Sequence, residues 1–382
     1  MKARYRKVIK KIYAYALALS LVLHVFNMGG EGGLKPFHIP AAIACVMTLL
    51  YSKKEKSYIL VCLFLCNVLI SAFLSSVSSS MSGFVNLFIV TLCCYGVSKT
   101  QIDDLLHILV VLIPIALMAL LYEAISNPIY RFQGFYNDPN YLCTTLIVFF
   151  FLSILTCYRF DNKILRLMAI ANNVMVVVLI IFTLSRTGLA CIVLLLIATF
   201  ANVIKRHIWK GVIVLLISVI AINHYAADFI DNQYMLLYER LFEKSDDLGS
   251  AGEYRSELSK QNLRFIGDNP IYLFWGMGPS ATSEDNAKQI PGLNQYRKAD
   301  NRDHNTWTSC LAEYGLFALV IFSLLLFRIV KGVVMQNRTI YRHVCIATCL
   351  VLFIFSLSLW QMTYLPFWWG LFLLSNRGLN CM

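Results

Sequence analysis

The chain has 382 residues, of which 58% are hydrophobic and only 14% charged, and its mean hydropathy is +0.65. Soluble domains carry about 25% charged residues, so the composition excludes an ordinary soluble protein and predicts an all-α, polytopic membrane protein. The formal net charge is +12. In a membrane protein this excess is first tested as a signal of which loops are cytoplasmic, because cytoplasmic loops are enriched in lysine and arginine, and only then as a signal of nucleic-acid binding.

Apolar runs that approach the length of a spanning helix, roughly 17–25 residues, recur along the chain. The first follows MKARYRKVIKK without a convincing cleavage site and is predicted to be a retained anchor. We predict about twelve transmembrane helices, nine within residues 1–226 and three within residues 306–382. They lie near 13–29, 37–52, 57–76, 81–97, 105–125, 140–158, 167–184, 188–204, 209–226, 306–328, 342–358 and 361–376.

The basic residues orient these helices. With the N-terminus inside, the inner segments hold 21 of the 33 lysines and arginines, whereas the short outer loops hold only Lys35, Arg131 and Arg186. This bias predicts that both termini are cytoplasmic. One long hydrophilic segment, 227–305, carries the remaining basic residues and is predicted to be a periplasmic loop, because long segments cross the membrane regardless of charge.

The twelve cysteines do not indicate a zinc site or a disulfide framework. All but Cys381 lie in apolar segments, and no histidines stand at ligand spacing. They are expected to behave as small buried hydrophobic residues.

The outer loop RFQGFYNDPNYL, residues 131–142, leads into the sixth predicted span. Asp138, Pro139 and Asn140 are suited to start a helix, because an acceptor side chain caps its first turn and proline lacks an N–H there. A cap alone would explain these three residues. Arg131, in the same loop, is either a solvated surface residue or a substrate contact.

Arg186 stands in the otherwise apolar stretch VMVVVLIIFTLSRTGLACIVLLLIATF, residues 174–200. A cation at the centre of a membrane helix costs roughly 2.5–3.5 kcal/mol on insertion scales. We predict that SRTG, residues 185–188, is a tight outer turn between two spans. Arg186 then either extends to lipid headgroups or binds a partner that this stretch does not supply.

The long loop contains SAGEYRSELSKQNLRFIGDNPIYLFWGMGPS, residues 250–280. It predicts a short amphipathic helix at about 253–266, stopped by Gly-Asp-Asn-Pro, with Leu258, Leu263, Phe265 and Ile266 on its apolar side. Arg255 and Arg264 are nine residues apart, about two and a half turns, so they are expected to point to different faces.

The tenth span opens with DHNTWTSCLAEYGL, from residue 303. His304 lies among polar residues at the predicted outer surface, where an imidazole can accept a proton. It is either a functional base or a structural residue at a helix start; His24, His107 and His224 are interpreted as structural.

Taken together, four motifs resemble the O-antigen ligase/polymerase superfamily, bacterial enzymes that use polyprenyl-diphosphate-linked sugars as donors. The resemblance covers roughly residues 130–325. Its residues are Gly134, Asp138, Pro139 and Asn140; Ser185, Arg186 and Gly188; Arg255, Pro270, Gly276 and Gly278; and His304, Asn305, Glu313, Gly315 and Leu316. The chain departs from the family at Ser259, where an aromatic residue often follows the helix arginine by four positions.

The resemblance implies a GT-C-like fold, shared with other polyprenol-dependent glycosyltransferases, with the long loop as a lid. Arg186 and Arg255 would bind the donor diphosphate, since arginine stays charged and contacts phosphate oxygens bidentately. His304 would act as the base on the acceptor hydroxyl, or orient it, during inverting glycosyl transfer. Arg131, Asn140, Arg264 and Asn305 are expected to bind substrate.

No nucleotide cofactor is implied, because the donor already carries its activation, and no carboxylate cluster in the sequence indicates a metal. The expected partners are the lipid-linked oligosaccharide and the bilayer, with a chain-length regulator left open and no nucleic acid. We favour a polymerase of O-antigen or exopolysaccharide repeat units, with an O-antigen ligase as the alternative. A flippase or other transporter is less favoured, because no halfway repeat is evident.

Overall fold

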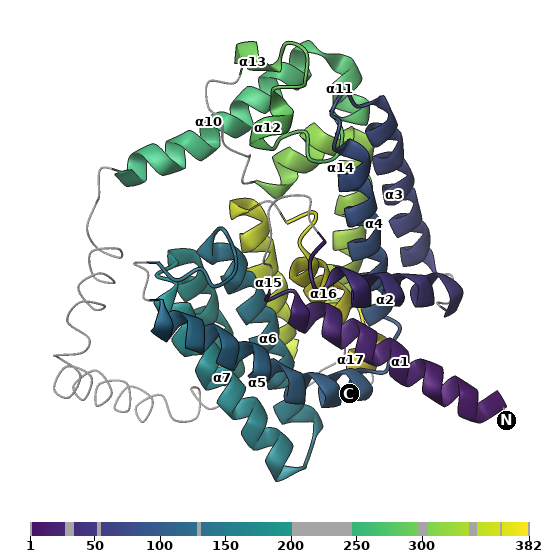
Figure 1. Ribbon diagram of the computed structural model, residues 1–382, viewed down its shortest axis with the longest axis vertical. Helices are drawn as coiled ribbons and strands as arrows, with labels where there is room; N and C mark the ends of the chain where they lie inside the picture. Colours follow the sequence, from purple (N-terminus) through teal and green to yellow (C-terminus); the bar gives the residue numbers. More distant parts are fainter. Residues whose placement is uncertain are drawn as a thin grey trace.

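The computed structural model is a bundle of helices (Figure 1). It describes residues 2–26, 34–51, 55–127, 131–200, 247–296, 305–335, 342–359 and 361–380. The all-α prediction is confirmed for this part of the chain. The helices are α1 Lys2–Leu23, α2 His38–Tyr51, α3 Lys56–Leu74, α4 Ser80–Val97, α5 Ile102–Ser126, α6 Pro139–Arg159, α7 Lys163–Phe182, an unlabelled helix Arg186–Phe200, α10 Asp247–Asp268, α11 Pro270–Trp275, α12 Glu284–Ala287, α13 Leu293–Tyr296, α14 Thr306–Val334, α15 Arg342–Ser358, α16 Leu365–Leu374 and α17 Arg377–Asn380.

Helices occupy eleven of the twelve predicted spans, and the span predicted at 209–226 lies outside the described residues. Among the described helices, α3, α4, α5, α6, α7 and α14 are the six that are long and apolar enough to cross a membrane. The protein is therefore a multi-pass membrane protein, while the total of twelve spans and the extent of the long loop stay predictions.

Helix α6 runs through the middle of the bundle, with α5, α7, α15 and α16 packed around it. Every residue from Leu142 to Thr156 is buried. The peripheral helices instead expose large apolar side chains such as Ile115, Leu167 and Phe327, which suits contact with lipid. Protein surrounds α6, and this explains why apolar residues lie on all sides of this helix.

Helix α16 is shorter than the span predicted at 361–376. It has 10 residues, all of them buried. A helix this short cannot cross a bilayer alone, but here neighbouring helices rather than lipid surround it. The cysteines of the described residues are free and most are buried, as expected, whereas Cys66 is exposed on α3.

Helices α10 to α13 gather at one end of the molecule, over α14 and the ends of α3 and α4 (Figure 1). Their small apolar core includes Phe265, Ile266 and Met277. Two hydrogen bonds fasten it to the turn between α3 and α4: Ser75 Oγ donates to Met277 O (2.6 Å) and Ser78 N to Gln289 Oε1 (2.9 Å). These are contacts between segments that were both predicted to be outside.

Helix α10 confirms the predicted amphipathic helix but is longer, with 22 residues. Leu258, Phe265 and Ile266 are buried as predicted, each 1% exposed, whereas Leu263 is 40% exposed. The assignment of Leu263 to the apolar side was wrong, because the helix turns a different edge toward α14. The predicted break is confirmed, since Asn269 leaves the helical conformation directly before α11.

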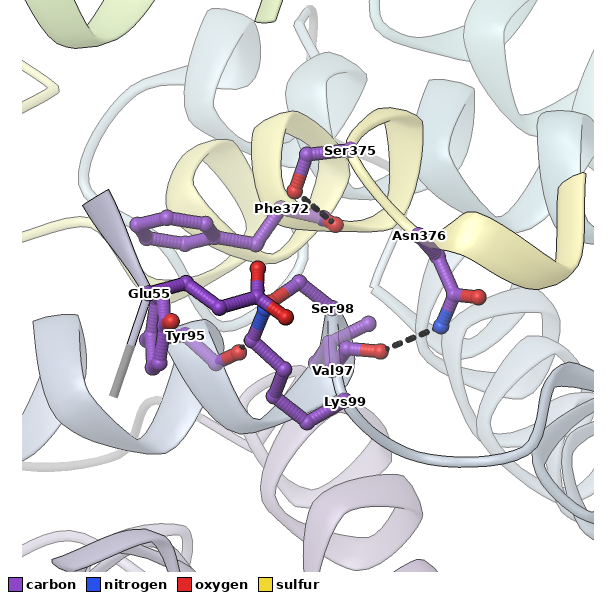
Figure 2. A network of polar contacts seen from close by, with 8 residues as sticks. All are labelled: Glu55, Tyr95, Val97, Ser98, Lys99, Phe372, Ser375 and Asn376. Carbon is purple, nitrogen blue, oxygen red and sulfur yellow. Dashed lines mark hydrogen bonds and ion pairs between the residues drawn. The ribbon is translucent and has the colours of Figure 1, made fainter. Parts of the chain in front are cut away.

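The other end of the molecule joins segments that were predicted to be inside (Figure 2). Lys99 Nζ lies 2.6 Å from the Glu55 carboxylate, which links the start of α3 to the end of α4. Asn376, after α16, donates to the carbonyls of Val97 (2.6 Å) and Thr100 (2.9 Å). These contacts agree with one common side for residues 52–57, 98–104 and the C-terminal tail.

Candidate functional site

Arg186 begins a helix. Thr183 and Leu184 make the turn after α7, Leu184 with φ 47°, and Ser185 is the cap. The Ser185 hydroxyl accepts from the backbone N–H of Gly188 (3.0 Å), and the Ser185 carbonyl accepts from that of Leu189 (2.9 Å). The prediction that residues 185–188 form the turn itself was therefore wrong, because the serine cap starts the helix one residue later.

This position favours an anion beside Arg186. First-turn N–H groups carry partial positive charge at a helix start. Arg186 is only partly exposed, and its Nε atom is buried without a hydrogen-bond partner in the described part of the chain. A buried N–H of a cation that lacks an acceptor is costly. The Arg186 guanidinium therefore has the properties of a site for a ligand anion.

The loop before α6 holds the Arg186 turn in place. Asp138 caps α6 by accepting from the Asn140 backbone N–H (2.7 Å), and Pro139 is the first helical residue, which confirms the predicted helix start. The Asn140 side chain is buried, and its Oδ1 accepts from the Ser185 hydroxyl. Two motifs that are 45 residues apart are thus joined directly.

Arg131 lies near the same turn. The backbone N–H of its neighbour Phe132 donates to the carbonyl of Phe182 (3.1 Å), at the end of α7. Arg131 is partly exposed, and it lies within electrostatic range of Cys143. A Cβ on Gly188 would meet the Cys143 sulfur at 2.4 Å, so the start of the Arg186 helix packs directly against α6 at Cys143. The structure brings Arg131, Asn140 and Arg186 together.

A second cluster forms where α11 meets α14. Gly315 interrupts α14 with φ 82° and ψ 176°. Because the helix is kinked there, the carbonyls of Ala312 and Glu313 accept from the N–H groups of Met277 (2.8 Å) and Gly278 (2.9 Å). A Cβ on Gly315 would lie 2.2 Å from the Phe274 carbonyl oxygen, so this close approach requires glycine.

The Glu313 carboxylate binds the turn that follows Gly278, at residues 280–282. It is fully buried and accepts from the Ser280 N–H (3.2 Å), the Thr282 N–H (3.2 Å) and the Thr282 hydroxyl (2.6 Å). The G-x-G and E-x-G-L motifs thus form one structural unit. Glu313 was named only as part of a motif; its role as an acceptor could not be inferred from spacing.

The remaining arginines, Arg255 and Arg264, belong to α10, which packs against α14. The Thr308 hydroxyl donates to the Ser259 hydroxyl (3.3 Å), so the position at which the family often has an aromatic residue contacts α14. Arg264 is exposed, with 68% of its side chain accessible, and lies 3.8 Å from Glu257. The Arg255 side chain and the whole of His304 lie outside the described residues.

Asn305 starts α14. Its Oδ1 accepts from the N–H groups of Trp307 (2.9 Å) and Thr308 (3.3 Å), so it is the cap of this helix. In the sequence, His304 immediately precedes this cap.

Gln361, which was not among the predicted site residues, connects α6 beside the Arg186 turn to the start of α14. Its Nε2 donates to Thr144 Oγ1 (3.3 Å), and its backbone N–H donates to Thr306 Oγ1 (3.0 Å). Thr144 in turn donates to the Asn140 carbonyl (3.1 Å). A lone amide between two apolar runs was the only signal in the sequence.

Comparison with known protein families supports the motifs. The family model described as O-antigen ligase matches residues 171–323. This range contains the Arg186 turn, α10, α11 and the first part of α14. The match supports the resemblance to the O-antigen ligase/polymerase superfamily. No curated protein matches the chain.

Proposed function

We propose that the protein transfers an oligosaccharide from a polyprenyl diphosphate to a sugar hydroxyl, and that it polymerises lipid-linked repeat units of O-antigen or exopolysaccharide. The observation that carries this proposal is the Arg186 guanidinium, whose buried Nε lacks a partner among the described residues. A diphosphate supplies the oxygens that a guanidinium binds bidentately.

In the proposed reaction, the acceptor hydroxyl oxygen attacks the anomeric carbon of the donor sugar. The bond from that carbon to the diphosphate breaks, and the configuration inverts. Arg186 and Arg255 neutralise the charge that develops on the leaving diphosphate, and His304 takes the hydroxyl proton. These residues supply the chemistry without a cofactor or metal.

The other proposed substrate residues have different roles in this scheme. Arg131 adds positive charge beside Arg186. Asn140 acts through Ser185, because its side chain holds the turn, and Asn305 acts through the start of α14. Arg264 is exposed on α10, where it would contact the glycan outside the reaction centre.

We place the site on the periplasmic face of the bacterial inner membrane, with both termini in the cytoplasm. Exposed Lys288 follows α12 and exposed Lys56 begins α3. In a protein without its native cysteines, Lys288→Cys should react with an impermeant maleimide in intact spheroplasts, and Lys56→Cys should react only after lysis. The reverse pattern would place the arginines in the cytoplasm and contradict the proposal.

The alternative is an O-antigen ligase, which is equally compatible with the family match. A ligase uses the same donor but transfers the finished chain to lipid A–core. Deletion of a polymerase should leave lipid A–core with a single repeat, since ligation continues. Deletion of a ligase should leave bare core, with polymer accumulating on polyprenol.

Gel electrophoresis of lipopolysaccharide from a deletion strain, with extraction of polyprenol-linked glycans, measures both outcomes. We expect the single-repeat band, restored to a ladder by the wild-type gene on a plasmid. Bare core with lipid-linked polymer would replace the polymerase proposal by the ligase. An unchanged profile of all surface glycans would contradict both.

A further inference from the structure

Gln361 lies in the short connection between α15 and α16, and it is completely buried. Its backbone N–H reaches α14 at Thr306, and its side chain reaches α6 at Thr144. Thr306 and Thr144 are themselves completely buried. One residue thus makes polar contacts with the second turn of α6 and the first residue of α14, which are far apart in sequence.

The hydrogen bonds fix the orientation of the Gln361 amide. The single hydroxyl hydrogen of Thr144 goes to the Asn140 carbonyl. Thr144 Oγ1 must then accept rather than donate toward Gln361, so the NH₂ group of the amide faces Thr144. The opposite oxygen, Oε1, is buried without a partner within the described residues.

These bonds form a continuous path from the Arg186 turn to the start of α14. The Ser185 hydroxyl, which caps the helix of Arg186, donates to Asn140. Asn140 accepts from Thr144, Thr144 from Gln361, and Gln361 donates to Thr306, which follows the Asn305 cap. Such a buried path restrains the distance between the elements it joins.

We propose that Gln361 is a positioning residue, which holds the Arg186 turn at a fixed distance from the start of α14 during sugar transfer. This role rests on the proposed function, in which the diphosphate lies at Arg186 and the acceptor hydroxyl at the start of α14. A small displacement between two such groups lowers the rate of transfer while binding of the donor is retained.

The test uses purified full-length protein and a lipid-linked repeat unit as donor. Thr144→Val removes the acceptor for Gln361, and Gln361→Met removes the amide at similar volume. Each should lower kcat on the order of 10-fold, with KM for the donor changed by less than about 2-fold, as expected for the loss of the bond between Gln361 and Thr144. Thr144→Val also removes the donation to the Asn140 carbonyl, a loss of the kind that the Thr156→Val control reproduces. The double variant should be no slower than the slower single variant, because both remove the same link.

Two variants serve as controls. Thr144→Ser keeps the hydroxyl and should retain kcat to within about 2-fold. Thr156→Val removes a buried hydroxyl from the same helix, where Thr156 Oγ1 donates to the Leu152 carbonyl (2.9 Å), and it should leave kcat unchanged. Thermal unfolding of each variant in detergent separates a loss of folded protein from a loss of rate.

The outcomes distinguish this inference from the proposed function. Wild-type kcat in Thr144→Val would overturn the positioning role, and a slow Gln361→Met beside it would indicate a direct contact between Gln361 Oε1 and the sugar instead. Additive losses in the double variant, or losses explained by unfolding alone, would also overturn it. Absence of turnover by the wild-type protein would contradict the proposed function itself.

Discussion

Arg186→Lys is expected to lower sugar transfer by about 100-fold or more, the magnitude typical of losing one donor that stabilises charge in a transition state. Lysine keeps the positive charge, but its ammonium cannot reproduce the planar, bidentate contacts of a guanidinium with phosphate oxygens. It also lacks the Nε–H group that is buried without a partner in the described structure. The measurement is turnover of the lipid-linked donor by the purified variant, normalised to folded protein.

Arg328→Lys is the matched control, because Arg328 is exposed in the latter half of α14, away from both clusters. It should retain wild-type turnover. If Arg186 only extended to lipid headgroups, lysine would serve nearly as well. Near-normal turnover of Arg186→Lys at wild-type protein levels would therefore remove Arg186 from the reaction.

Glu313→Gln is expected to destabilise the packing of residues 276–282 on α14 by about 3 kcal/mol, since a buried donor left without an acceptor costs roughly 1–3 kcal/mol and more near charge. The Glu313 oxygens accept from three donors of this turn: the N–H of Ser280, and the N–H and hydroxyl of Thr282. In either orientation, the glutamine NH₂ would face a backbone N–H.

Limited proteolysis of residues 247–296 and the thermal unfolding midpoint measure this effect, and transfer should fall with them. Glu123→Gln is the control, because the Glu123 carboxylate accepts an exposed hydrogen bond from Asn127 (3.0 Å) and an amide oxygen can replace the carboxylate there. Equal protease resistance of Glu313→Gln and wild type would show that the buried carboxylate does not hold this segment.

Local sequence patterns were sufficient to predict the class of protein and the positions of most helices. Hydropathy is a property of each segment, so eleven of the predicted spans coincide with described helices. The cap at Asp138 and the break before Pro270 were also predicted, because capping and proline geometry depend on neighbouring residues. Leu263 marks the limit of such patterns, since the face that α10 buries depends on how it lies against α14.

The sequence by itself determined that this is a multi-pass helical membrane protein whose motif-bearing segments follow one another from residue 134 to 316. Only the tertiary structure decided that Asn140 holds Ser185, that Glu313 binds the turn at 280–282, and that Gln361 links α6 to α14. It also decided that the Nε atom of Arg186 is buried. Each of these depends on groups far apart in the chain, which meet because buried polar atoms must find partners within the packed bundle.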